Sequence, residues 1–249
     1  MAGATLRYEH LSKHYGDTVA VRDLSGDIRP GVVTGMLGPN GAGKSTALKC
    51  LLGLATPTSG SALVDGIAYA QLSDPGRRVG TVLETRGFHP GLTGRQNLRV
   101  LAAAIDIDDS TVARVLDAVS LTDAADRRIK GYSLGMRQRL SVAAGLLGDP
   151  DTLVLDEPGN GLDPHAIVWL RNLLRGFAAE GRTVLVSSHQ LAEMQHTVDD
   201  VFIMHRGDLV TQGSIREVCG DRSLEDAFLA LTEGESRSEE HTSELQSRG

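Results

Sequence analysis

Apolar and polar side chains alternate along the first 30 positions of the chain. Turn residues interrupt the alternation at 16–17 and 25–27, and its apolar members are Leu6, Tyr8, Val19, Val21, Leu24 and Ile28. A period of two that is broken by Gly and Asp predicts short antiparallel strands joined by turns. We therefore expect an N-terminal antiparallel β subdomain.

Compact apolar runs without alternation follow at 32–37, 152–155, 183–186 and 201–204, of which the last is the weakest. Continuous runs of this length are typical of strands buried on both faces of a parallel sheet. Helical spacing separates them, as in the set Leu170, Leu173, Leu174 and Phe177. The alternation of strand and helix predicts an α/β fold with a parallel sheet.

The segment 95–148 has no strong strand pattern and predicts a helical insertion between two sheet-forming halves. We expect one domain over 1–232, with this helical subdomain at about 95–150, and a disordered tail over 233–249. Residues 237–247 read RSEEHTSELQS, which resembles the translation of a common sequencing-library adapter. We expect 237–249 to be an artefact and exclude them from the fold prediction. The alternative is an acidic, serine-rich disordered tail.

Composition and charge narrow the class of protein. Of the 249 residues, 41% are hydrophobic and 23% are charged, a balance typical of a soluble globular domain. No apolar run approaches the roughly 18–20 residues of a membrane helix, and the first ten residues lack the apolar core of a signal peptide. Cys50 and Cys219 lie far apart, which suits a reducing compartment. A net charge of −7 disfavours nucleic acid as the main partner.

The strongest candidate for chemistry is a glycine-rich segment between an apolar run and an amphipathic helix. It matches the pattern G-x-x-x-x-G-K-[ST] and comprises Gly38, Pro39, Asn40, Gly41, Ala42, Gly43, Lys44, Ser45 and Thr46. Its glycines let backbone N–H groups converge on phosphate oxygens, and the helix N-terminus adds its positive end. Lys44 would contact the β- and γ-phosphates, and the Ser45 hydroxyl would bind Mg²⁺. The alternative is a glycine-rich turn that happens to contain a lysine.

Two adjacent carboxylates end the apolar run at 152–155. Because side chains alternate along a strand, we expect Asp156 and Glu157 to point in different directions. Asp156 would hold Mg²⁺ through water, and Glu157 would face the γ-phosphate and polarise the attacking water. The alternative is a pair of helix-capping or turn carboxylates.

The order of these motifs resembles the ATP-binding cassette, the nucleotide-binding subunit of ABC transporters, over about residues 6–231. The resemblance implies an ABC-type P-loop NTPase core with ATP and Mg²⁺ as its ligands. It also identifies a signature segment at 132–139, where Ser133 and Gly135 match the family and Leu134 and Met136 depart from it. In the family this segment contacts the γ-phosphate of the ATP held by the other subunit. Without the family, it is a turn before a basic amphipathic helix.

The resemblance gives roles to three further residues. Asp163, within NGLDP at 160–164, matches the D-loop that passes between the two subunits, and it is also a candidate helix N-cap. His189 matches the switch histidine that contacts the γ-phosphate, and Tyr15 matches the aromatic residue that stacks on adenine. Taken alone, a histidine at a strand end is more often structural.

One position departs from the family in an informative way. The apolar run at 79–83 is followed by Glu84, where most cassettes have the glutamine of the Q-loop. The glutamate form resembles the cassettes of bacitracin and lantibiotic self-protection exporters. A carboxylate at this position can accept a hydrogen bond from water or approach Mg²⁺. The alternative is a surface carboxylate and an alignment that is off by one position.

The resemblance thus implies the ATPase subunit of a bacterial ABC exporter, with a drug, a peptide antibiotic or a lipid-like molecule as cargo. Lys44, Glu157 and His189 would be its catalytic residues. It further implies a homodimer of cassettes, a separate integral membrane permease, and a cytoplasmic position on the inner face of the cell membrane. The main alternative is a soluble cassette ATPase of translation or DNA repair. An inactive regulatory ATP-binding module is another, and the intact catalytic residues argue against it.

Overall fold

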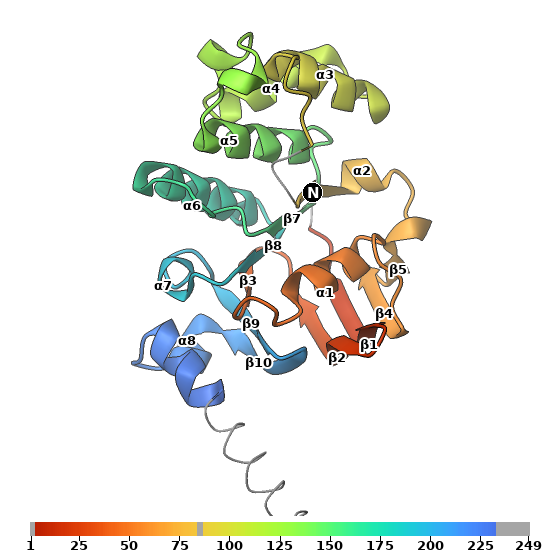
Figure 1. Cartoon of the computed structure of the whole chain (residues 1–249), viewed down its shortest axis with the longest axis vertical. Coiled ribbons are helices and arrows are strands. Elements are labelled where there is room, and N and C mark those ends of the chain that lie inside the picture. Colours follow the sequence, from red (N-terminus) through yellow and green to blue (C-terminus); the bar gives the residue numbers. More distant parts are fainter. Residues whose placement is uncertain (1–2, 84–86, 233–249) are drawn as a thin grey trace, which may run out of the picture.

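The computed structural model describes residues 3–83 and 87–232, which form two β-sheets surrounded by helices (Figure 1). The predictions for Glu84 and for the tail 233–249 lie outside the described residues. Across the described ranges, no helix combines the length and the apolar character needed to cross a bilayer.

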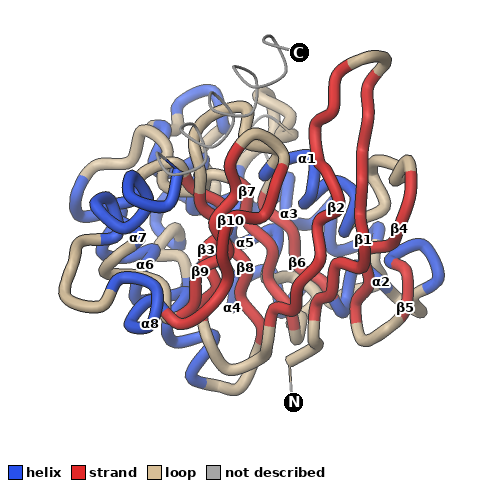
Figure 2. Tube along the Cα trace, turned by 90° about the horizontal axis from the view of Figure 1, so that it is seen from below, coloured by secondary structure: helices blue, strands red, loops and turns tan. Residues whose placement is uncertain are grey.

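The first sheet is antiparallel and has the strand order β2-β1-β4-β5. Its strands are β1 (Leu6–Tyr15), β2 (Thr18–Ile28), β4 (Ser59–Val64) and β5 (Ile67–Ala68). β1 and β2 form a long hairpin that pairs Leu6 with Ile28 at its base and Tyr15 with Thr18 at its tip. Figure 2 shows this hairpin extending beyond the rest of the molecule. The prediction of an antiparallel subdomain at the N-terminus is confirmed.

The second sheet has the order β10-β9-β3-β8-β7-β6 and is parallel except for β10, which runs antiparallel to β9. Its strands are β3 (Val33–Leu37), β6 (Val79–Val82), β7 (Thr152–Asp156), β8 (Thr183–Ser188), β9 (Asp200–His205) and β10 (Asp208–Ser214). Parallel neighbours end at the same edge of a sheet, so the loops after β3, β7 and β8 lie close together. This edge carries the predicted phosphate loop, the carboxylate pair and the histidine.

Burial explains why the strands of this sheet have continuous apolar runs. Leu153 and Leu155 of β7 enter a core shared with the helices on one face, whereas Val154 enters a second core shared with the antiparallel sheet. Both faces of the strand are therefore covered, as expected for a parallel sheet between two layers. The α/β fold class predicted from the sequence is confirmed.

Helices connect the strands and cover the sheets. Their bounds are α1 (Lys44–Leu51), α2 (Pro75–Arg78), α3 (Gly94–Ala104), α4 (Asp109–Ala118), α5 (Leu134–Gly145), α6 (Pro164–Ala179), α7 (Leu191–Met194) and α8 (Ile215–Cys219). In Figure 1, α3, α4 and α5 form one end of the molecule, away from the antiparallel sheet. The start of α3 is fixed by a capping box in which Thr93 and Gln96 exchange side-chain to backbone hydrogen bonds.

Candidate active site

Two glycines of the loop between β3 and α1 are required by close contacts. Gly38 has φ of 155°, and a Cβ there would overlap the carbonyl oxygen of Met204. Gly43 has φ of 99°, and its Cβ would overlap the carbonyl oxygen of Ala20. Only glycine fits both the backbone angles and the space. The loop is thus held between β9 and β2, with the N-terminus of α1 at its end, where helix N–H groups bind anions.

The ammonium group of Lys44 lies inside this loop. Its side chain is 5% exposed, and Nζ donates to the carbonyl oxygens of Gly38 at 2.8 Å and Pro39 at 3.2 Å. The same Nζ lies 3.4 Å from Oε1 of Glu157. An ammonium has three protons, and these three acceptors match them. Lys44 is therefore fixed in position by the loop whose anion it is expected to contact.

The carboxylates of Asp156 and Glu157 diverge for a reason other than strand alternation. β7 ends at Asp156, and Glu157 lies just beyond it with a left-handed φ of 50°. The structure thus places the two carboxylates apart as expected, but the predicted cause is wrong. A left-handed non-glycine residue costs about 1–2 kcal/mol, and such strain is common at functional sites.

A buried hydroxyl from the neighbouring strand joins this pair. Ser187 of β8 is fully buried, and its Oγ donates a short hydrogen bond to Oδ1 of Asp156. The same Oγ accepts a hydrogen bond of 3.0 Å from the backbone N–H of Glu157. Ser187 carries no functional signal in the sequence, because a serine inside an apolar strand gains its meaning only from the register of β7 and β8.

His189 completes a chain of contacts through Glu157. Its Nδ1 lies 2.9 Å from Oε2 of Glu157, so one carboxylate oxygen faces the histidine and the other faces Lys44. The imidazole is about one-third exposed, and the carboxylate is less so. A carboxylate held at both oxygens has a fixed direction, as a group that orients a water molecule must have.

A pocket of about 340 Å³ lies over these groups, between the hairpin and the phosphate loop. Its lining includes Tyr15, Thr18, Val19 and Ala20 from the hairpin, residues 40–46 and Glu157. Tyr15 is half-exposed at the hairpin tip, and Nζ of Lys13 lies 4.8 Å from the centre of its ring. Lys13 is anchored in turn by a 2.8 Å hydrogen bond to the carbonyl of Thr56. The structure thus places the predicted adenine-stacking residue at the mouth of the phosphate pocket.

The signature and D-loop residues lie together, outside this pocket. Ser133 caps α5 by accepting from the N–H of Met136, and Asp163 caps α6 by accepting from the N–H of Ala166. The capping role predicted for Asp163 is confirmed. The two helix starts are adjacent, because a Cβ on Gly161 would lie 2.6 Å from Cδ2 of Leu134.

The pocket lining within the described ranges includes no residue of α5 or α6. Within one chain, the signature segment therefore lies outside the pocket formed by the phosphate loop. The predicted amphipathic character of α5 is wrong, because the helix buries the polar side chains of Gln138 and Ser141 as well as apolar ones.

Comparisons with known proteins agree with this arrangement. A family model described as ABC transporter matches residues 21–160. The lantibiotic transport ATP-binding protein SrtF of Streptococcus pyogenes is 35% identical over 223 residues, which cover 90% of this chain and 95% of that protein. The bacitracin transport ATP-binding protein BcrA of Enterococcus faecalis is 40% identical over 213 residues, which cover 84% of this chain and 69% of that protein.

A solved structure described as the ATP-binding subunit of an ABC transporter matches with a TM-score of 0.82 and 27% identity, and it covers 91% of this chain and 99% of the other. The chain therefore belongs to the ABC transporter family, as an ATP-binding subunit that hydrolyses ATP to power transport.

Proposed function

We propose that this chain drives the export of a peptide antibiotic or a related cargo, as a homodimer bound to a separate permease on the inner face of the cell membrane. The cargo class rests on the relatives SrtF and BcrA, which are named for lantibiotic and bacitracin transport. Glu84, in the position where most cassettes have glutamine, is the feature of this sequence that agrees with that class.

The proposed hydrolysis is supported by one observation above all. Glu157 contacts both Lys44 and His189 beneath the pocket. In the proposed mechanism, Glu157 orients and polarises a water for in-line attack on the γ-phosphate. Lys44 and the backbone N–H groups of the loop stabilise the charge on the phosphate oxygens. His189 holds Glu157 in place and contacts the γ-phosphate. The ring of Tyr15 stacks on adenine.

The donor set suits Mg²⁺, which prefers hard oxygen ligands. The Ser45 hydroxyl lies in the pocket at the start of α1, and Asp156 ends the neighbouring strand β7. Ser187 binds Oδ1 of Asp156, and within the described part of the chain Oδ2 accepts no hydrogen bond, so Oδ2 remains for the cation or its water. When bound, Mg²⁺ would neutralise charge on the β- and γ-phosphates.

A second copy of the chain would complete each site. Ser133 and Gly135 lie outside the pocket formed by their own phosphate loop, and the neighbouring Leu134 is 48% exposed. In the proposed dimer, the signature of one copy closes the pocket of the other, and Asp163 lies between them. Each ATP is then held by residues of both copies.

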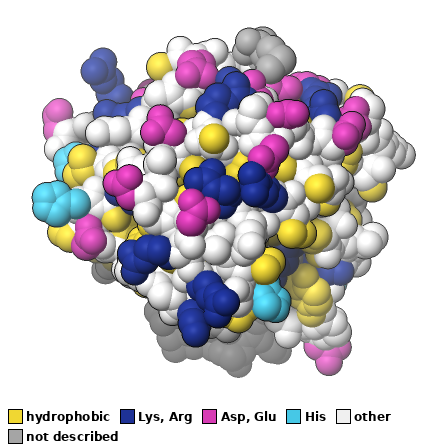
Figure 3. Space-filling view, turned by 90° about the horizontal axis from the view of Figure 1, so that it is seen from above, with side chains coloured by type: hydrophobic (Ala, Val, Ile, Leu, Met, Phe, Trp, Pro, Cys, Tyr) yellow, Lys and Arg dark blue, Asp and Glu magenta, His cyan; other side chains and the backbone are white. Residues whose placement is uncertain are grey.

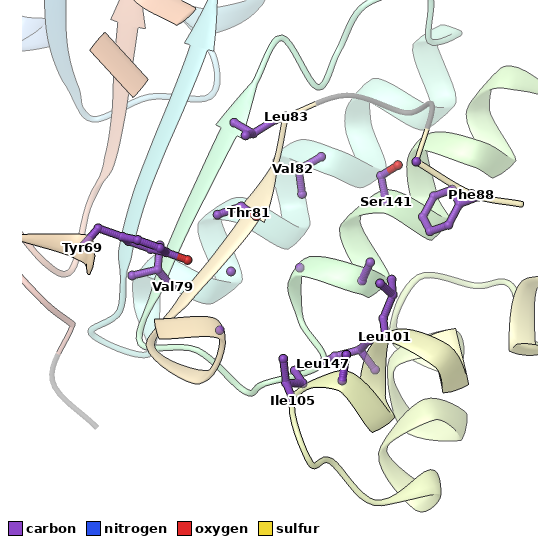
Figure 4. A pocket seen from close by; sticks show the side chains of 16 residues that line it. Tyr69, Val79, Thr81, Val82, Leu83, Phe88, Leu101, Ile105, Ser141 and Leu147 are labelled. Atoms are coloured by element: carbon purple, nitrogen blue, oxygen red, sulfur yellow. The ribbon is translucent and has the colours of Figure 1, made fainter. Parts of the chain in front are cut away.

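The permease is proposed to dock between β6 and the helical end. A second pocket of about 340 Å³ lies there, and Figure 4 shows apolar side chains such as Val82, Phe88 and Leu101 facing it. Val100 and Leu101 on α3 are 60% and 40% exposed, respectively. Figure 3, which views this end of the molecule, shows basic and acidic side chains intermixed with hydrophobic ones rather than a large field of one sign. Such a surface suits a protein partner better than a nucleic acid.

The test of this function is Glu157→Gln, compared with Lys44→Ala. Removing the water-polarising carboxylate should lower ATP turnover by about 10²–10⁴-fold with ATP binding retained. The substituted protein should then elute as an ATP-bound dimer in size-exclusion chromatography. Lys44→Ala should instead weaken the binding of labelled ATP, because it removes a contact made in the bound state.

Unchanged steady-state phosphate release by Glu157→Gln would remove Glu157 from the role of base. Elution of this variant as a monomer at saturating ATP would contradict the homodimer.

A further inference from the structure

The hydroxyl of Ser187 touches both members of the carboxylate pair, and its hydrogen-bonding direction is fixed. A backbone N–H can only donate, so the N–H of Glu157 must point at Oγ of Ser187. The single hydroxyl proton is therefore directed at Oδ1 of Asp156, to which Oγ donates a short hydrogen bond. The hydroxyl thus donates to Asp156 and accepts from Glu157, so both of its hydrogen-bonding roles are in use.

The strand register keeps this hydroxyl in place. Ser187 pairs directly with Asp156 across β7 and β8, and its side chain is fully buried, so water does not compete for these bonds. The carbonyl oxygen of Ser187 also lies 3.3 Å from the same N–H of Glu157. The backbone alone would therefore hold Glu157 loosely, whereas the carboxylate of Asp156 depends on the hydroxyl.

The two bonds orient groups with different proposed tasks. The bond to Oδ1 fixes the Asp156 carboxylate and leaves Oδ2 for a cation or its water. The bond from the N–H supports the left-handed backbone of Glu157, which directs its side chain to Lys44 and His189. One hydroxyl oxygen thus contacts both the carboxylate of Asp156 and the backbone of Glu157.

We infer that Ser187 is a positioning residue that couples the metal-holding carboxylate of Asp156 to the water-polarising carboxylate of Glu157. The inference rests on the roles proposed above for these two residues. It goes beyond those roles, because it makes Mg²⁺ binding and turnover depend together on a side chain that does not touch ATP.

The experiment compares Ser187→Ala with Ser188→Ala. Ser188 is the next residue of the same strand and is also buried, but its Oγ accepts from the N–H of Gln190 and contacts neither carboxylate. Three quantities are measured on the full chain: affinity for a fluorescent ATP analogue with Mg²⁺ and with EDTA, phosphate release at saturating ATP, and melting temperature. Ser188→Ala controls for the loss of a buried strand hydroxyl.

Ser187→Ala should lose most of the gain in affinity that Mg²⁺ gives the wild type, while its affinity in EDTA stays within about twofold. Turnover should fall about tenfold, which corresponds to about 1.4 kcal/mol of activation free energy. Ser188→Ala should keep both the Mg²⁺-dependent gain and the turnover. Ser187→Thr retains the hydroxyl, and threonine suits a strand, so it should restore the Mg²⁺ effect.

The inference is overturned if Ser187→Ala matches Ser188→Ala both in turnover and in the gain of ATP affinity that Mg²⁺ gives. A lower melting temperature of Ser187→Ala would not change this conclusion. Asp156→Asn, measured in parallel, separates this failure from a failure of the proposed roles. If Asp156→Asn loses the Mg²⁺ effect and Ser187→Ala keeps it, only the positioning role is wrong. If Asp156→Asn also keeps it, the assignment of Asp156 itself is wrong.

Discussion

Replacing Tyr15 by Ala tests whether the hairpin tip binds the adenine base. The ring is half-exposed at the pocket, and the ammonium of Lys13 lies 4.8 Å from its centre. Stacking of a base on an aromatic side chain contributes about 1–3 kcal/mol. At 1.4 kcal/mol per tenfold, Tyr15→Ala should raise the Kd for ATP by about 5- to 140-fold. Tyr15→Phe keeps the ring and should change the Kd little.

The assay compares ATP with inorganic tripolyphosphate, which has the phosphates but no base. Tyr15→Ala should leave the affinity for tripolyphosphate unchanged, because the phosphate loop is intact. Lys13→Met removes a cation from beside the ring and keeps the aliphatic chain. The contact between Lys13 and Tyr15 is made without ATP and is worth about 0.5–1 kcal/mol, so this variant should lose up to that much unfolding free energy while its Kd for ATP changes little.

Two results would refute this reasoning. If Tyr15→Ala binds ATP as the wild type does, the base lies elsewhere. If it loses affinity for ATP and tripolyphosphate equally, Tyr15 acts by shaping the loop and does not contact the base.

The remaining predictions concern the D-loop and the tail. Gly161 and Gly181 have left-handed φ of 71° and 82°, but only at Gly161 would a Cβ meet Leu134, at 2.6 Å. Gly161→Ala and Gly181→Ala should therefore both cost up to about 1–2 kcal/mol of unfolding free energy. Only Gly161→Ala should also lower ATPase activity. Equal ATPase activity of the two variants would contradict a functional contact between the D-loop and the signature. Deleting residues 237–249 should leave ATP binding and melting temperature unchanged, and a melting temperature lower by several degrees would show that the tail contributes to folding.

The strands buried on both faces were predictable from sequence, whereas β4 and β10 were not. β3, β7 and β8 are buried on both faces, so their apolar runs are continuous and easy to recognise. β10 is an edge strand whose residues are nearly all half-buried, and its sequence DLVTQGS has neither a run nor an alternation. β4 lies between β1 and β5 and begins with Ser-Gly-Ser, which gives no strand pattern, so its position depends on pairing with β1. The pairing of distant segments determines these strands.

The candidate site shows a similar limit. Local motifs located Lys44 and Asp156, because a phosphate loop and a strand ending in carboxylates are continuous in sequence. Ser187 and Lys13 act through partners far away in the chain, at Asp156 and Thr56, and no local pattern marks them. The left-handed backbone of Glu157 was also outside the prediction, because it follows from the end of β7 and from the hydrogen bond to Ser187.

The position of the pocket relative to the two sheets bears on how the site works. Its base end belongs to the hairpin of the antiparallel sheet, and its phosphate end belongs to the loop after β3 of the parallel sheet. The sheets already meet beside this loop, where the N–H of Arg22 donates to the carbonyl of Gly207 at 2.8 Å and the N–H of Gly207 donates to Ala42 at 3.1 Å. With the proposed roles, ATP adds a further link between the same two sheets. Hydrolysis then removes only the contacts to the γ-phosphate, because the base stays on Tyr15 and the β-phosphate stays with Lys44 and its loop. The groups around Glu157 are thus released while the nucleotide still links the two sheets.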